Sequence, residues 1–192
     1  MEKVNVLDLV SASLERKADW VEEAFAKGEY VAECYDKDGK LKWRDTIKNV
    51  VCTLGKNVAL DAFLAGSSYT VVGPYMGLIS SVDYTGVPVV GDTMASHGTW
   101  KEAGITNAPT YTTRKTCAWA PAGSGAKALS AALAFVFTGN GTVKGCFLCF
   151  GTGAVATVDS TAGYLLSAGV FTGGDKVVVA TDTLNVSYTF SM

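Results

Sequence analysis

The sequence predicts a mainly β protein: an antiparallel β-sandwich or jelly-roll-like body, an N-terminal amphipathic helix and one short internal helix. Two observations predict the β body. From residue 69 onward, runs of β-branched and aromatic residues alternate with Gly, Pro and Asn at short intervals. In the last run, Leu184, Val186, Tyr188 and Phe190 alternate with polar residues, as in a strand with one buried face. Several short strands at such spacing are typical of an antiparallel sandwich or barrel.

The first 28 residues predict a helical arm that precedes this body. Their apolar residues recur in steps of three and four, which places them on one face of a helix with charged residues opposite. Gly28 is placed to end the helix in a left-handed conformation. The apolar face could pack on its own domain or dock on a neighbouring protein. The candidate docking residues are Leu7, Val10, Leu14, Val21 and Phe25.

The body, expected over 29–192, begins with a hairpin over 29–48, whose turn contains the segment DKDG. The same segment invites comparison with a calcium-binding loop. Gly39 comes two residues too early for such a loop, and Ile47 stands where a bidentate Glu should coordinate the ion. We therefore interpret Asp36 and Asp38 as turn residues, and no metal site is expected.

A short helix is expected over 54–65, capped by Thr53 and ended at Gly66. The β-sandwich is expected over 69–192. The segment GNG at 139–141 predicts a hairpin turn. Candidate strands are 75–80, 110–118, 131–137, 142–150, 163–171 and 184–191.

Composition argues against several functional classes. A formal net charge of -2 and a pI near 5.4 do not support a nucleic-acid partner. No apolar run approaches the ~20 residues that span a bilayer, so no membrane partner is expected. The N-terminus lacks the apolar core of a signal peptide, which makes secretion by that route unexpected.

Charge is distributed unevenly along the chain. Residues 1–64 hold ten of the sixteen Lys and Arg and twelve of the eighteen Asp and Glu. The other 128 residues hold six of each. Because a folded monomer normally coats itself with charge, this long charge-poor segment suggests a surface that other subunits cover.

The five cysteines are odd in number and have no regular spacing, and we expect them to be reduced and buried. Cys146 and Cys149 have CxxC spacing, but they lie inside an apolar run that reads as a strand. A zinc site would need two further ligands, and His97 is the only histidine. Neither a metal nor a redox role is therefore expected.

Other candidate motifs lack the context that their chemistry needs. GTGAVA at 151–156 is not followed by a helix-forming segment, and GSGAK at 123–127 lacks the spacing of a phosphate-binding loop. His97 could act as a base for Ser96 or Ser81, but we interpret it as a loop residue. The pair RK at 114–115 could contact a phosphate or an acidic neighbour. We expect no cofactor and no catalytic residue, and hence no enzyme.

Several segments taken together resemble a family of small β-rich virion structural proteins of tailed bacteriophages. These segments are WRDTIKNVVCTLGKN (43–57), YMGLIS (75–80), GDTMASHGTW (91–100), TYTTRKTCAWAP (110–121), GTVKGCFL (141–148) and GDKVVVATDTLNVSYTF (174–190). The resemblance implies a homo-oligomeric capsid decoration or head-fibre-type protein. Its partners would be itself and other virion proteins such as the major capsid protein, with assembly in the cytoplasm of the bacterial host. A tail tube, adaptor or fibre-attachment protein is the structural alternative.

A carbohydrate-binding β-sandwich module is an alternative from another class. Such modules stack exposed aromatic rings on sugars, and Trp43 and Tyr84 would belong to that set. The main candidate glycan contacts are Trp100 and Trp119.

Overall fold

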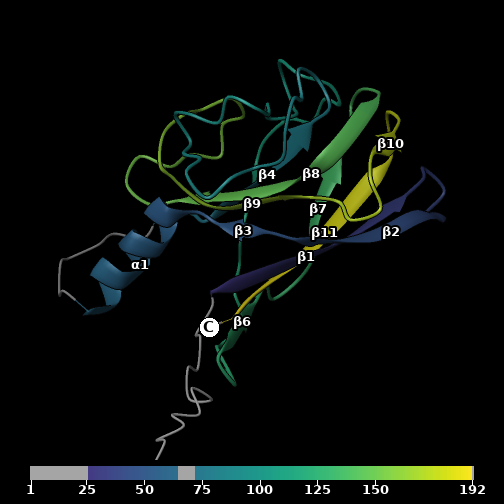
Figure 1. The fold of residues 1–192 in the computed structure, drawn as a ribbon. Helices are drawn as coiled ribbons and strands as arrows, with labels where there is room; N and C mark the ends of the chain where they lie inside the picture. The colour runs from purple at the N-terminus through teal and green to yellow at the C-terminus, as the bar shows by residue number, and fades with distance from the viewer. Residues whose placement is uncertain (1–25, 65–71, 192) are drawn as a thin grey trace, which may run out of the picture.

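Two antiparallel β-sheets make up most of the computed structural model, which describes residues 26–64 and 72–191 (Figure 1). Sheet A has the strand order β2-β1-β11-β6, and β7 also pairs with β11. Sheet B has the order β3-β9-β8-β4-β5, and β10 also pairs with β8. A single helix of the described chain, α1, spans Thr53–Leu64. A mainly β protein with antiparallel sheets and a short internal helix is confirmed for this part of the chain.

The strands of sheet A are β1 (Lys27–Tyr35), β2 (Leu41–Lys48), β6 (Ala126–Ala128), β7 (Leu133–Val136) and β11 (Thr183–Ser191). The strands of sheet B are β3 (Val50–Val51), β4 (Tyr75–Ser80), β5 (Lys115–Thr116), β8 (Gly141–Phe150), β9 (Tyr164–Val170) and β10 (Lys176–Val178). Sheet A therefore joins the two ends of the described chain, because β1 pairs with β11 over its whole length.

The hairpin expected over 29–48 is formed by β1 and β2. Its turn is held by the carboxylate of Asp36, which accepts hydrogen bonds from the backbone N–H groups of Asp38 and Lys40, each at 2.9 Å. Gly39 has a φ of +78°, the left-handed conformation that glycine tolerates best. Asp36 thus acts as a turn residue, and the same backbone hydrogen bonds lower its pKa.

One hydrophobic core lies between the two sheets. Alternate residues of β1 and β11 point into it, as the alternation at the end of the chain predicts. From sheet B, Leu78 and Cys146 point into the same core. The hydroxyl of Tyr30 crosses from sheet A to lie 2.6 Å from that of Ser167 on β9, so a polar contact fixes the two sheets against each other.

Sheet B is buried on both faces. Its second face carries Phe147, Cys149 and Leu165, which pack with Trp100 and Met94 from the long connection between β4 and β5. Helix α1 lies beside β9 in the same part of the molecule (Figure 1). This double burial explains why β8 reads as a continuous apolar run rather than an alternating one.

The predicted strands 75–80, 142–150, 163–171 and 184–191 correspond to β4, β8, β9 and β11 within one residue at each end. The strand predicted over 131–137 is shorter, as β7. Strands β3, β6 and β10 were not predicted, because two or three residues are too few to show a period.

The strand predicted over 110–118 is wrong except at β5. The backbone N–H of Arg114 donates to the carbonyl of Ala156 at 2.9 Å, and that of Cys117 donates to Pro74 at 2.9 Å. The segment therefore bonds mainly to loops instead of forming a long ladder. Thr113 adds to these contacts, because its hydroxyl donates to the carbonyl of Ala156 at 2.7 Å.

The hairpin predicted at GNG is also wrong. Strand β7, which precedes it, pairs with β11 in sheet A, whereas β8, which follows it, belongs to sheet B. Residues 139–141 therefore connect the two sheets.

Thr53 was predicted to cap the short helix, but it is the first residue inside α1. The first helical hydrogen bond runs from the N–H of Lys56 to the carbonyl of Cys52 at 3.0 Å, so Cys52 occupies the cap position.

Candidate functional site

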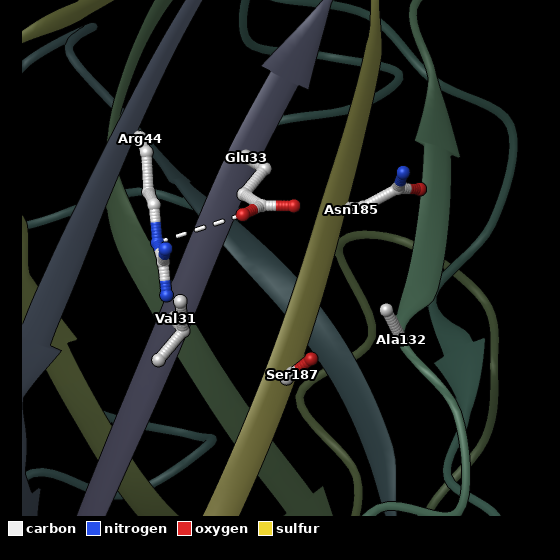
Figure 2. Close-up of a pocket in the computed structure, with 6 residues that line it drawn as sticks. All are labelled: Val31, Glu33, Arg44, Ala132, Asn185 and Ser187. Carbon is white, nitrogen blue, oxygen red and sulfur yellow. Dashed lines mark ion pairs between the residues drawn. The ribbon is translucent and has the colours of Figure 1, made fainter. Parts of the chain in front are cut away.

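A groove with a volume of 250 Å³ lies on the face of sheet A that points away from the core (Figure 2). Its lining comes from three neighbouring strands, β2, β1 and β11, and from the residue just before β7. The lining residues are Val31, Glu33, Arg44, Ala132, Asn185 and Ser187.

Strand alternation places these side chains on the outer face. Tyr30, Ala32 and Cys34 of β1 point into the core, so the residues between them, Val31 and Glu33, point outward. Strand register then brings the neighbours together. Glu33 lies opposite Arg44 on β2 and opposite Asn185 on β11, while Val31 lies opposite Ser187.

The charged groups of the groove form a loose surface pair. Arg44 Nε lies 3.5 Å from Glu33 Oε1, and their side chains are 63% and 34% exposed. Glu33 Oε2 also accepts a hydrogen bond from the hydroxyl of Tyr35 at 2.8 Å, which raises the pKa of Tyr35. Exposed pairs of this kind add little stability. The groove offers hydrogen-bond donors and acceptors, an arrangement suited to recognition.

The whole outer face of sheet A divides into a high half and a low half. The high half, on β2 and β1, carries mostly long side chains, with Thr46 and Val31 as exceptions, whereas the low half, on β11, β7 and β6, carries mostly short ones. We define the outer face by four rows across the sheet, each read from β2 to its far edge: Leu41, Tyr35, Thr183 and Val136; Arg44, Glu33, Asn185 and Ala134; Thr46, Val31, Ser187 and Ala132; and Lys48, Glu29, Thr189 and Ala128. Ala132 precedes β7 and is placed in the third row because it lines the groove together with Ser187 and Val31.

A second polar centre is fully buried beside sheet B. Arg114 and Glu102 form two parallel hydrogen bonds, from Nε to Oε1 at 2.8 Å and from Nη2 to Oε2 at 2.7 Å. Their side chains are 0% and 5% exposed. Such bidentate pairs are strong, but each partner is costly to bury alone.

This ion pair also ties together loops that are distant in sequence. Arg114 Nη2 donates to the carbonyl of Ser160 at 2.7 Å, and Nη1 donates to that of Val155 at 3.3 Å. Glu102 accepts from the backbone N–H of Asp159 at 2.8 Å. Burial raises the pKa of Glu102, although the hydrogen bonds from Arg114 oppose that rise. With all of these groups bonded to one another, the cluster serves to hold the loops.

Arg114 of the RK pair and the two glycine-rich motifs make contacts within the fold. Arg114 contacts an acidic neighbour, one of its two predicted alternatives. GTGAVA at 151–156 forms a turn, in which the N–H of Ala154 donates to the carbonyl of Gly151 at 2.9 Å. GSGAK at 123–127 contains a turn that leads into β6, in which Gly123 and Ala126 bond to each other.

All five cysteines are free and buried, as expected. Cys146 points into the core between the sheets, whereas Cys149 points to the opposite face of sheet B. Residues three apart on a strand face opposite sides, so these two thiols do not face each other. Burial raises the pKa of Cys149 to about 11. The arrangement corresponds to cysteines that serve as small core residues.

Trp100, a predicted exposed glycan contact, is 0% exposed, so that prediction is wrong. The loop that carries it folds over sheet B, where the indole ring packs 5.4 Å from that of Phe147 and its N–H donates to Asp92 at 2.9 Å. The other candidate, Trp119, is half-buried with its ring 6.1 Å from Tyr188. His97 is a loop residue that stacks on Trp100 at 3.9 Å.

The candidate docking residues Leu7, Val10, Leu14, Val21 and Phe25 lie outside the described residues. Sequence reasoning missed the outer face of sheet A. Alternation along β1 and β11 could have identified its residues one strand at a time, but grouping them requires the strand order.

Within residues 26–64 and 72–191, no three His, Cys, Asp or Glu side chains gather as a metal site would require. No helix in those ranges has the length and apolar character needed to cross a bilayer. Comparison with protein-family models and with curated proteins finds no match to this chain.

Proposed function

We propose that this protein is a structural component of a tailed-bacteriophage virion, an oligomeric capsid decoration or head-fibre-type protein. Its partners in this proposal are other copies of itself and virion proteins such as the major capsid protein. It needs no catalytic residue and no cofactor, because its role is to occupy a repeated position and to hold neighbours together.

The surface of the charge-poor segment carries the proposal. Of the twelve charged residues beyond position 64, Asp92, Glu102, Arg114 and Asp182 are buried, so few remain to solvate the surface. Of the eleven large hydrophobic residues that are exposed in the described chain, nine belong to the same segment. Five are Val87, Val89 and Val90 in one loop and Val177 and Val179 near β10. Exposed apolar surface that charge does not surround is typical of protein interfaces.

The finer architecture is part of the same proposal. We propose that the two sheets form a jelly-roll-like β-sandwich, which their common core supports. The predicted helix end at Gly28 is wrong, because Lys27 and Gly28 are the first residues of β1 and pair with β11. We propose that residues 1–25 form a helical arm whose apolar face docks on a neighbouring virion protein. The body would then make the repeated contacts, and the arm the contacts with a different partner.

Immunogold electron microscopy tests the proposal on particles of a phage whose genome encodes this chain. An antibody raised against residues 66–192 would be the probe, with particles of an unrelated phage as the control. Gold over the heads is the expected result. Gold confined to the tails would reject the capsid position in favour of a tail component, and particles without label would reject the virion role.

A further inference from the structure

We propose that the outer face of sheet A binds the same face of a second copy of this chain, in a dimer with its two-fold axis parallel to the strands. The inference rests on the self-association that the proposed function requires, and it names the surface involved. In a two-fold interface each contact occurs twice, because the same patch is used by both copies. The face must therefore be complementary to itself.

The heights of the side chains satisfy this condition. Long side chains such as Arg44 and Glu33 rise from β2 and β1, whereas Ala132 and Ser187 on the other half are short, which leaves the groove between them (Figure 2). A rotation by 180° about an axis between β1 and β11 places the high half of one copy over the low half of the other. The groove then receives the partner's long side chains.

The chemistry of the four rows also matches under that rotation. In the first row, Leu41 lies against the partner's Val136. These two residues are 49% and 54% exposed in the single chain, and in the dimer they cover each other. In the second row, Glu33 faces Asn185 of the other copy, a hydrogen-bond donor. In the same row, the side chain of Arg44 lies over the partner's Ala134, whose short side chain leaves room for it. No row places two like charges opposite each other.

The size of the face sets the strength of the contact. Four strands spaced about 4.8 Å apart and four rows about 6.7 Å apart cover roughly 500 Å² on each copy. The total of roughly 1,000 Å² lies in the range of weak, transient interfaces, which points to a reversible dimer. On a symmetric particle many such weak contacts act together, so each can be weak.

Ala134 offers the sharpest test, because it is exposed and lies opposite the partner's Arg44 in the proposed dimer, whereas within its own chain two strands separate it from Arg44. Ala134→Glu would add an attractive pair twice per dimer, and Ala134→Arg a repulsive one. Sedimentation equilibrium of the 192-residue chain should show the Glu variant binding more tightly and the Arg variant more weakly, each by about three- to thirtyfold. Thr112→Arg, at an exposed loop position outside the four rows of the outer face, is the matched control and should leave the dimer constant unchanged.

Opposite shifts for the two charges would support the proposal, after circular dichroism has shown that both variants fold. A wild-type chain that stays monomeric, or equal effects of the two charges, would overturn it. If the variants change incorporation into particles but leave self-association unchanged, the face binds a different virion protein, which also overturns it. The proposed function fails separately, when particles carry no gold label.

Discussion

Replacing Arg114 by Met should destabilise the protein strongly. The substitution keeps most of the side-chain volume but removes the charge, and it leaves Glu102 with its carboxylate 5% exposed and without its partner. Two hydrogen bonds to Glu102 are lost, together with those to the carbonyls of Ser160 and Val155. The buried carboxylate must then either stay charged without compensation or take up a proton.

Breaking one side of a buried ion pair costs about 3–5 kcal/mol, a large share of the total stability of a domain. For a chain of this size, each kcal/mol lowers the midpoint temperature by about 2–4 °C, which gives a decrease of roughly 6–20 °C. Replacing both members, with Arg114→Met and Glu102→Leu together, should cost less than Arg114→Met alone, because no unpaired charge remains buried.

Urea denaturation followed by far-UV circular dichroism would measure the change in the free energy of unfolding. Arg44→Met is the matched control, because Arg44 forms the 3.5 Å pair with Glu33 at 63% side-chain exposure, and its loss should cost less than about 1 kcal/mol. If Arg114→Met also costs less than about 1 kcal/mol, the buried pair does not hold the loops as described.

The contacts of Asp45, the close packing at Gly145 and the proposed arm can each be tested separately. Burial alone would raise the pKa of Asp45, but hydrogen bonds from Lys176 and from loop groups together outweigh burial and lower it. The stability that Asp45 contributes is therefore present above its ordinary pKa and is lost as the pH falls through the lowered pKa. Between about pH 5 and pH 2, wild type should therefore lose more unfolding free energy than Asp45→Asn, and parallel pH profiles would contradict this. Gly145→Ala would drive a Cβ into the backbone carbonyl oxygen of Gly169 and should lower the free energy of unfolding by about 3 kcal/mol or more in urea denaturation. Gly91→Ala is the control, because a Cβ there meets nothing within 4 Å. Deleting residues 1–25 should abolish attachment to particles and leave the circular dichroism spectrum of the body intact; loss of folding would refute a separate arm.

Local patterns in the sequence were enough to predict much of the fold. The alternation along β11 and the apolar run of β8 identify strands because each depends only on neighbouring residues. The turn at DKDG was predictable for the same reason, since the carboxylate of Asp36 bonds to its own loop.

Features that depend on distant residues were not predictable. Arg114 leaves the predicted strand because Glu102 and the loop at 155–160 hold it. Trp100 is buried because its loop folds across sheet B, although its sequence context reads as an exposed loop. The outer face of sheet A requires that β1, from one end of the described chain, pair with β11, from the other. Nothing local in either strand specifies that pairing.

The most direct test of the account is the size of the 192-residue chain in solution, measured by sedimentation velocity over a wide range of concentrations. If other copies cover the charge-poor surface, a population at multiples of 20.1 kDa should appear and grow with concentration. A single species of 20.1 kDa at every concentration would contradict the account, because exposed valines and the outer face of sheet A would then remain in contact with water.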